Sequence, residues 1–279
     1  MRMTIPYCTL RDLTGLPRYW RHSYLARRRM PPHRRLPYGP HPRQYYLLLE
    51  PPDSQPTDPL PWAVYLHGGA WTFGTPEAFR PAARPWLAQD FRVLLPSYRR
   101  PPGVRLQEIV ADCRAALVHA ADFARKTGRP LTAAPQVGGI SAGGHLAALL
   151  ALHPDWWTTA GWPLPPDRAL LCAAPLDLSI LRPRRIFSKR SAQDPMLLLD
   201  RATDVRWLLL HGQDDGMVAY RHSLRFYEAL QARGAEAALL GIPGGGHLDS
   251  GRWTYDDADA YASTVADFIR AHPAPRGRG

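Results

Sequence analysis

Strand-length apolar runs alternate with helical segments along most of this chain, and no other feature constrains its fold more strongly. Seven such runs are present, at residues 45–49, 62–66, 91–95, 136–140, 169–173, 206–210 and 237–242. Strands that alternate with helices are joined by right-handed crossovers and form a mostly parallel sheet, with helices on both faces. The sequence therefore predicts an α/β fold built on one such sheet.

The clearest helical pattern lies between the third and fourth runs. Its apolar residues recur every three or four positions, and they are Leu106, Ile109, Val110, Cys113, Leu117, Ala120 and Ala124. Gly128 follows where a C-terminal cap is expected. No repeat or linker divides the chain into two folded halves. We therefore expect a single domain at residues 44–270, followed by a flexible tail at 271–279.

The first 43 residues differ from the rest in composition. They are rich in Arg and Pro, and five prolines fall between residues 31 and 42. Proline interrupts a helix because it lacks an N–H group and its ring clashes with the preceding turn. We expect residues 1–43 to form an arm that packs on the domain without a long helix. The segment 181–199 is too short for a large cap domain and is a candidate small lid.

The net charge of +11 is concentrated near the N-terminus. Residues 1–49 contain ten arginines and one acidic residue, Asp12, so the rest of the chain is nearly neutral. Almost all basic residues are Arg, which together with 30 prolines indicates a compositional bias rather than selection for phosphate contacts. We expect no nucleic-acid partner. Contact of the Arg-rich cluster at 27–35 with an anionic surface is the less favoured alternative to a solvated arm.

Cysteine usage and hydropathy favour an ordinary cytosolic enzyme. Cys8, Cys113 and Cys172 are widely spaced and match neither a disulfide framework nor a metal site, so we expect reduced packing residues. No apolar run approaches the ~18 residues of a spanning helix, and no secretory signal is recognisable. The expectation is a cytoplasmic protein without metal, cofactor or stable membrane insertion.

A Gly-x-Ser-x-Gly sequence stands between a strand-like run and a helix-forming segment. It comprises Gly139, Ser141 and Gly143, after the run at 136–140. At a strand–turn–helix elbow the serine adopts a strained backbone, and side chains at the two glycine positions would collide. Such a turn raises the serine hydroxyl above the sheet. The pattern predicts a nucleophile, and the alternative is a purely structural Gly-rich turn.

A serine hydroxyl needs a base at neutral pH, and the base needs an acid to orient it. His247 is favoured among the 11 histidines because it lies in a Gly-rich loop directly after the run at 237–242. The acid is expected after a strand, between nucleophile and base in the chain. Spacing favours Asp215 over Asp214, which would brace the turn. The predicted catalytic residues are Ser141, Asp215 and His247.

Small residues follow the run at 62–66, in the sequence HGGAW at 67–71. They allow backbone amides to approach the negative charge that develops on an attacked carbonyl oxygen. The predicted donors of this oxyanion hole are the amides of Gly69, Ala70 and Ala142. The last of these lies at the positive end of the predicted nucleophile helix.

These segments resemble the α/β-hydrolase superfamily. The resemblance rests on residues 67–71, 139–144 and 211–218 and on the late His247, and it spans roughly residues 45–269. It implies an eight-stranded sheet with at most a small lid, and metal-free hydrolysis by a Ser-His-Asp triad through an acyl-enzyme intermediate.

A narrower resemblance concerns the small esterases related to hormone-sensitive lipase and to kynurenine formamidase. Ala70 stands where the lipase branch usually has a third glycine, which is similar to the HGGxW loop of formamidase and feruloyl-esterase-like members. Tyr98, Arg99 and Asp112 also resemble residues of that branch.

The leading functional expectation is a carboxylesterase that acts on small acyl or aromatic esters. An arylformamidase that hydrolyses an N-formylkynurenine-type amide is the alternative, and a noncatalytic ligand-binding homologue is less favoured because all three triad positions are filled. We expect Trp71 and Phe73 at the mouth of the substrate pocket. Trp157 is a further candidate for the lining, although the tryptophans near it could equally cover the sheet edge. The partner is a small-molecule ester, and whether the chain forms a homodimer is left open.

Overall fold

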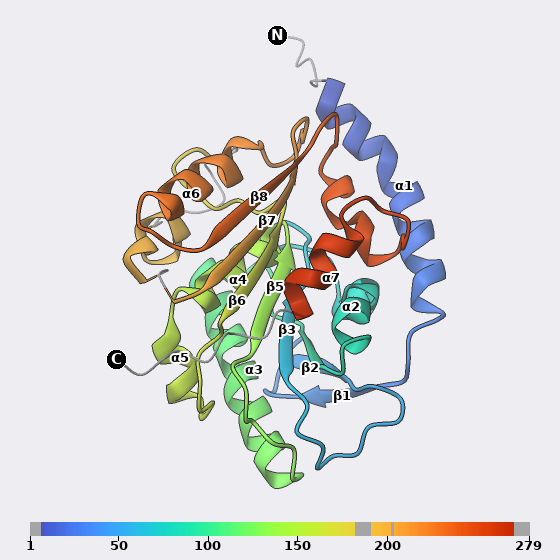
Figure 1. The fold of residues 1–279 in the computed structure, drawn as a ribbon, viewed down its shortest axis with the longest axis vertical. Coiled ribbons are helices and arrows are strands. Elements are labelled where there is room, and N and C mark those ends of the chain that lie inside the picture. Colours follow the sequence, from blue (N-terminus) through green and yellow to red (C-terminus); the bar gives the residue numbers. More distant parts are fainter. Residues whose placement is uncertain (1–6, 182–190, 202–203, 271–279) are drawn as a thin grey trace.

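An eight-stranded sheet forms the centre of the structure, a computed structural model that describes residues 7–181, 191–201 and 204–270 (Figure 1). The strands are β1 (His33–Pro37), β2 (Tyr45–Leu49), β3 (Trp62–Leu66), β4 (Arg92–Pro96), β5 (Gln136–Ile140), β6 (Arg168–Cys172), β7 (Arg206–Gly212) and β8 (Ala237–Ile242).

Their order across the sheet is β1-β2-β4-β3-β5-β6-β7-β8. β2 pairs antiparallel with both β1 and β4, whereas every pair from β4 to β8 is parallel. The predicted mostly parallel sheet is confirmed, and the seven predicted runs coincide with β2 to β8 to within two residues at each end.

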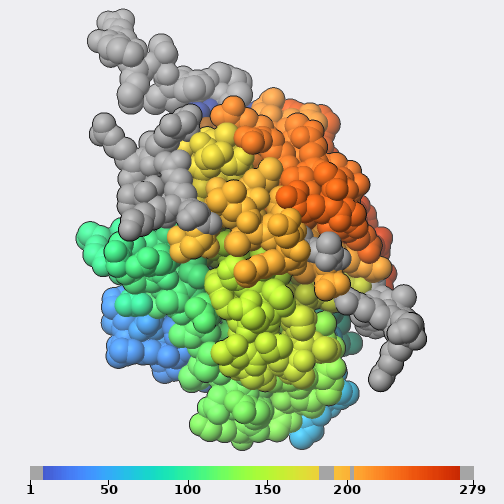
Figure 2. Space-filling view, turned by 90° about the vertical axis from the view of Figure 1, so that its left-hand side faces the viewer, coloured from blue at the N-terminus to red at the C-terminus, as the bar shows by residue number. Residues whose placement is uncertain are grey.

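Helices cover both faces of the sheet, as the strand–helix alternation predicts. The first face carries α3 (Leu106–Lys126), α4 (Ala142–Ala151), α5 (Pro154–Thr159) and α6 (Arg221–Gln231). The second carries the 3₁₀ segment η1 (Pro76–Ala83), α2 (Arg84–Leu87), the 3₁₀ segment η6 (Leu248–Thr254) and α7 (Ala262–Arg270). Figure 2 views the molecule from the side of the first face, where the green to orange segments of α3, α5 and α6 form the surface. Every residue of α4 is buried, which explains why its sequence is almost entirely small and apolar.

The N-terminal segment differs from the expected irregular arm. A 21-residue helix, α1 (Tyr7–Arg27), runs along the second face, and β1 forms the edge strand of the sheet (Figure 1). The prolines that argued against a helix lie after residue 30, and only Pro17 falls inside α1, on its exposed side. The segment does pack on the rest of the molecule, because the helix buries Asp12, Tyr19 and Ser23. The domain therefore includes β1 and begins before residue 44.

Two predicted features fall partly or wholly outside the described residues. The candidate lid at 181–199 is described only at its ends, with Leu181 buried and three short 3₁₀ segments, η3 (Ser191–Gln193), η4 (Pro195–Leu197) and η5 (Leu199–Arg201). The tail at 271–279 lies outside the description, as does the side chain of Cys8. Cys113 and Cys172 are buried free thiols, as expected.

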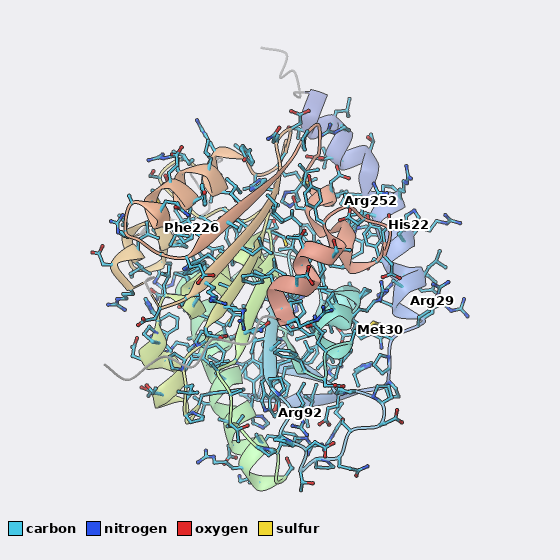
Figure 3. The ribbon with its side chains drawn as sticks, viewed as in Figure 1. His22, Arg29, Met30, Arg92, Phe226 and Arg252 are labelled. Carbon is cyan, nitrogen blue, oxygen red and sulfur yellow. The ribbon has the colours of Figure 1, made fainter. Side chains whose placement is uncertain are left out.

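A buried arginine occupies the end of the sheet where the parallel strands begin. Arg92, at the start of β4, is fully buried, and its Nε donates to Glu50 Oε1 at 2.9 Å. Arg129 Nη2 donates to the second oxygen of the same carboxylate at 2.8 Å. In Figure 3 Arg92 lies toward one end of the molecule, while Arg252 of η6 lies toward the other. The sheet thus separates this ion cluster from the ends of the strands where the predicted site residues gather.

Candidate active site

Ser141 occupies a sharp elbow between β5 and α4. Its backbone has φ 55° and ψ −125°, a conformation that non-glycine residues rarely adopt, and its N–H donates to Cys172 O at 2.8 Å. A Cβ atom added to Gly139 would lie 2.4 Å from the carbonyl group of Gly143, and one added to Gly143 would lie 2.0 Å from Leu66 O. The two glycines are therefore needed because strand and helix backbones approach closely on either side of the serine.

Asp215 and His247 form a buried hydrogen-bonded pair. His247 Nδ1 donates to Asp215 Oδ2 at 2.7 Å, and the Asp215 side chain has no exposed surface. Asp215 Oδ1 accepts the N–H groups of Met217 and Val218, both at 2.8 Å. With Nδ1 carrying the proton, Nε2 of His247 is left as the acceptor. This is the tautomer that a general base requires.

The neighbouring carboxylate points elsewhere. The Asp214 side chain is 53% exposed and lies 3.9 Å from the guanidinium of Arg11. Its backbone N–H donates to Gly245 O at 2.9 Å and so joins the acid turn to the histidine loop. Of the two candidate acids, the structure brings Asp215 to the histidine and leaves Asp214 at the surface.

His211 is a residue whose part in the site the sequence did not reveal. Its Nε2 donates to Asp215 Oδ2 at 3.0 Å and to Val218 O at 2.8 Å, while its Nδ1 accepts the hydroxyl proton of Ser223 at 2.7 Å. Its spacing of four from Asp215 on the same strand end was the only available signal.

Each member of the pair shifts the pKa of the other toward its charged form. Burial opposes ionisation of Asp215, but the adjacent His247 and the hydrogen bonds from His211 and His247 outweigh it and lower the pKa of Asp215 well below its usual range. Burial likewise opposes protonation of His247, but Asp215 outweighs it and raises the pKa of His247 above its ordinary value of 6.5. His247 therefore gains affinity for a proton, as a base in this position requires.

Ser141 and His247 line the same cavity, which has a volume of about 350 Å³. Most of its walls are apolar, with Leu13, Leu16, Tyr19 and Trp20 contributed by α1. Among the described residues no hydrogen bond joins Ser141 Oγ to His247 Nε2. In unliganded enzymes this bond is often long or poorly aligned and shortens when substrate binds. The structure thus brings the predicted nucleophile and base to one cavity without a direct bond between them.

The loop after β3 presents unpaired amides beside this cavity. Gly69, Ala70 and Trp71 all have positive φ, at 123°, 49° and 60°. In the described part of the chain, no intramolecular hydrogen bond uses the N–H of Gly69, Ala70 or Ala142, and the first two of these residues line the cavity with Ser141. Free amides near a nucleophile are the donors that an oxyanion hole needs.

A stacked pair of rings supports this loop from below. His67 is buried, its Nδ1 donates to Gly68 O at 2.8 Å, and its ring stacks on Tyr98 with centroids 4.4 Å apart. Burial lowers the pKa of His67 to about 3, so the imidazole is neutral. Next to Tyr98, Arg99 forms a two-pronged ion pair with the buried Asp112. The segment therefore braces the loop and takes no direct part in the cavity.

The predicted pocket residues separate into two groups. Trp71 and Phe73 line the cavity that holds Ser141 and His247. Trp157 does not, because it is fully buried in the core, donates its indole N–H to Leu150 O at 2.9 Å and packs edge-on against Trp162. The prediction for Trp157 was wrong, since α5 turns its indole under α4, away from the nucleophile. The cavity wall that replaces it comes from α1, which lies more than 100 residues earlier in the chain.

Within the described residues, no cluster of three or more His, Cys, Asp or Glu side chains is suited to hold a metal ion. No described helix combines the length and the apolar character needed to cross a bilayer.

The sheet order and the serine elbow at the carboxyl end of β5 define an α/β-hydrolase. The model of the alpha/beta hydrolase fold family matches residues 63–220, more than half of the chain, and the chain belongs to that family. The model of the prolyl oligopeptidase family matches residues 182–273, which include the acid and histidine loops. No match to a curated protein was found by sequence comparison.

Solved structures of an esterase share the fold. The apo form of Thermogutta terrifontis esterase 2 is 25% identical, with a TM-score of 0.69 over 85% of this chain and 91% of that one. The same esterase phosphonylated by sarin is 23% identical, with a TM-score of 0.70 over 85% and 92% of the two chains. Its butyrate-bound form is 22% identical, with a TM-score of 0.67 over 87% and 98%. The expected α/β-hydrolase fold is thereby confirmed, and the solved structures that share it are those of an esterase.

Proposed function

We propose that this protein is a serine esterase that hydrolyses small carboxylic esters through an acyl-enzyme intermediate. The observation that carries the proposal is the hydrogen bond of His247 to the buried Asp215, in a cavity that Ser141 shares. Family membership alone would not assign a reaction, because one fold hosts many functions.

The proposed mechanism uses each group at a stated atom. His247 Nε2 accepts the hydroxyl proton while Ser141 Oγ attacks the ester carbonyl carbon. The amides of Gly69, Ala70 and Ala142 donate to the oxygen that becomes negative. His247 then gives its proton to the leaving alcohol, and the acyl group stays on the serine. A water molecule, deprotonated by the same imidazole, releases the acid and restores the serine.

The cavity favours short acyl groups and aromatic substrates. Its volume of about 350 Å³ is near the lower limit of small-molecule sites. Tyr19, Trp20, Trp71 and Phe79 supply aromatic walls, and no Asp, Glu, Lys or Arg side chain lines it within the described residues. The similar esterase of Thermogutta terrifontis has been solved with propionate and with butyrate bound, which supports a short acyl chain here.

Turnover of p-nitrophenyl acetate and butyrate tests the proposal. Ser141→Ala should lower kcat by a factor on the order of 10⁶, as loss of a triad nucleophile does in other serine hydrolases, and should abolish covalent labelling by a fluorophosphonate probe. Ser263→Ala, an exposed serine of α7, is the matched control and should retain both.

Two results would overturn the assignment. Ester turnover that persists in Ser141→Ala would exclude this serine as the nucleophile. Release of formate from N-formylkynurenine by the unaltered protein, with no turnover of either ester, would assign arylformamidase action instead.

A further inference from the structure

Asp12 of α1 is buried against the two loops that carry the acid and the base. It is the sole acidic residue in the first 49, and it is only 4% exposed. Its Oδ1 accepts the backbone N–H of His247 at 3.1 Å, and its Oδ2 accepts the N–H of Gly216 at 2.8 Å. One carboxylate thus joins the residue after Asp215 to His247 itself.

We propose that Asp12 is a positioning residue for the catalytic histidine, and that α1 holds the acid and histidine loops through it. The inference rests on the proposed esterase function. Asp12 would act through His247 and would not contact substrate.

The loops need such a link because their own sequence constrains them weakly. Residues 243–247 read PGGGH, and glycine allows many backbone conformations. Within the loop, Gly246 N–H donates to Asp249 at 2.8 Å, and the backbone bond from Asp214 to Gly245 ties it to the acid turn. Neither bond reaches the backbone of His247. Among the described residues, the Asp12 carboxylate is the acceptor of the His247 backbone N–H.

Neighbouring side chains of α1 reinforce the same attachment. Thr9 Oγ1 donates to Gly216 O at 2.7 Å. Arg11 donates from Nη1 to Gly244 O at 2.9 Å and from Nη2 to Asp214 O at 3.1 Å. These three side chains lie within one turn of α1, and together they bind both loops. Thr9 and Arg11 bind carbonyl groups, and Asp12 binds N–H groups.

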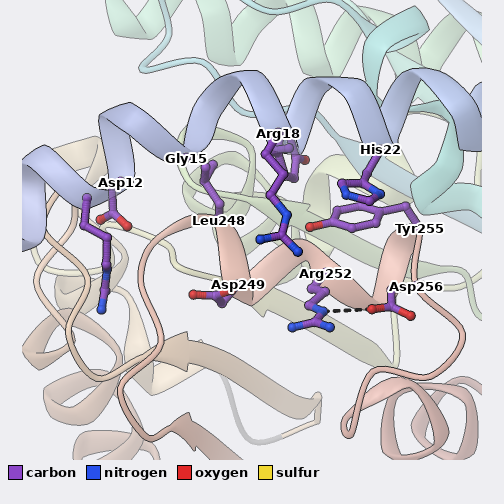
Figure 4. Close-up of a pocket in the computed structure, with 11 residues that line it drawn as sticks. Asp12, Gly15, Arg18, His22, Leu248, Asp249, Arg252, Tyr255 and Asp256 are labelled. Carbon is purple, nitrogen blue, oxygen red and sulfur yellow. Dashed lines mark hydrogen bonds and ion pairs between the residues drawn. The ribbon is translucent and has the colours of Figure 1, made fainter.

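Asp12 is shielded from water, although a groove lies beside it. Figure 4 shows the groove, which has a volume of about 450 Å³, between α1 and η6, with Arg18, His22 and Arg252 along it and Asp12 near one end. Arg252 pairs with Asp256 at 2.9 Å. The groove is open to water, yet Asp12 remains nearly unexposed. Water therefore competes only weakly for the hydrogen bonds of this carboxylate.

The carboxylate also acts on the charge of the imidazole. The titratable groups that face Asp12 are His247 and Asp215, with Arg11 beside it on α1. Its negative charge adds to that of Asp215 in raising the pKa of His247. Burial raises the pKa of Asp12, against the hydrogen bonds from Gly216 and His247. Removal of the negative charge should therefore lower the pKa of His247.

Two substitutions remove the contacts of Asp12 in steps. Asp12→Asn removes the charge and one of the two hydrogen bonds, because its amide NH2 replaces one acceptor oxygen, whereas Asp12→Ala removes the charge and both hydrogen bonds. The expected result is a loss in kcat of about 10-fold for Asn and about 100-fold for Ala, with KM changed less than about 3-fold. Rates are expressed per active site, counted with the fluorophosphonate probe. Arg21→Ala, on the exposed side of α1, is the control and should match the unaltered protein.

Two readouts distinguish positioning from a merely structural role. In Asp12→Asn the acid limb of kcat/KM should move to lower pH, because the imidazolium form loses the stabilisation that the negative charge of Asp12 provides. NMR titration of the His247 ring should show the same direction of change. A purely structural role would lower the melting temperature and the number of active sites, while kcat per site and the acid limb stayed unchanged, and that outcome would overturn the proposal.

Failure of the proposed function leaves a different signature. If the unaltered protein hydrolyses no ester, the esterase assignment fails, yet the NMR titration still tests whether Asp12 acts on His247. If esters are hydrolysed but neither kcat nor the His247 pKa responds to Asp12→Asn, the positioning role alone is wrong.

Discussion

At the scale of single residues, His247 is held by two carboxylates, one at its ring and one at its backbone. Its ring donates to Asp215, and its backbone N–H donates to Asp12. Both carboxylates favour the protonated ring, and the net direction is a raised pKa. The residue is therefore fixed in orientation and tuned as a base by groups that lie 32 and 235 positions away in the chain.

This electrostatic arrangement predicts the pH dependence of turnover. Only the neutral ring of His247 can accept the proton of Ser141, so kcat/KM should fall as pH decreases through the raised pKa. The midpoint of the acid limb should lie above pH 6.5, the ordinary value for histidine. A pH profile of p-nitrophenyl butyrate hydrolysis measures it. A midpoint at or below 6.5 would contradict the expectation.

The elbow predicts strong intolerance at Gly143. A methyl group there would lie 2.0 Å from Leu66 O, so Gly143→Ala must displace strand or helix. We expect a loss of about 3 kcal/mol in the free energy of unfolding and no fluorophosphonate labelling. Gly15→Ala in α1 is the matched control, because its added methyl group makes ordinary contact with Leu248 at 3.5 Å. Chemical denaturation compares the two, and equal stability would refute the steric argument.

At the scale of secondary-structure elements, α1 has two roles in the site. Its inner side supplies Asp12 to the loops, and the neighbouring positions Leu13, Leu16 and Trp20 form a wall of the cavity. Trp20 packs edge-on against both Tyr19 and Phe79. The helix thus limits the space available to a substrate.

Shortening Trp20 should broaden the range of acyl chains. Trp20→Ala removes an indole from the wall, so longer acyl groups fit while short ones lose contacts. The ratio of kcat/KM for p-nitrophenyl octanoate to that for the butyrate should rise about 10-fold, since one methylene contributes roughly 10-fold or more in a fitted pocket. Tyr24→Ala, on the exposed side of the same helix, should leave the ratio unchanged. An unchanged ratio in Trp20→Ala would show that this wall does not contact the acyl chain.

The sequence predicted those elements whose signals are local. The strands of the sheet follow from short apolar runs, and the elbow, the HGGAW loop and the order of acid and base follow from spacing. The role of α1 could not be predicted, because its sequence has weak periodicity and its buried side is defined by contacts with loops more than 200 residues away. Trp157 was misjudged for the same reason, since the direction of an indole after a helix depends on what packs beneath it.

At the scale of the whole molecule, the two ends of the sheet differ in their chemistry. The carboxyl ends of the parallel strands carry the cavity, whereas the opposite end holds Glu50 between Arg92 and Arg129. Burial opposes ionisation of Glu50, but hydrogen bonds from the two arginines outweigh it and lower the pKa of Glu50 below 4.5. This cluster joins β2, β4 and the segment after α3.

Loss of that carboxylate should reduce stability and spare activity. Glu50→Gln leaves the fully buried Arg92 without its counter-charge, so we expect the free energy of unfolding to fall by about 3 kcal/mol at pH 7. Because the pKa of Glu50 is lowered on folding, its contribution is present above the unfolded value and declines as pH falls through the folded one. The difference from the unaltered protein should therefore shrink in acid. Urea denaturation at several pH values tests this. The kcat/KM at 25 °C is the control and should be unchanged, because the cavity lies at the opposite end of the sheet.

The bond between Asp12 and His247 also has a consequence for how the chain is made. The two residues are 235 positions apart, so at about 5–20 residues per second a ribosome needs roughly 10–50 s to deliver the second after the first. Throughout that interval α1 can pack on η1 through Trp20 and Phe79, but the two loops that bind Asp12 are not yet made. Slower elongation would lengthen the time for which this carboxylate lacks its backbone partners.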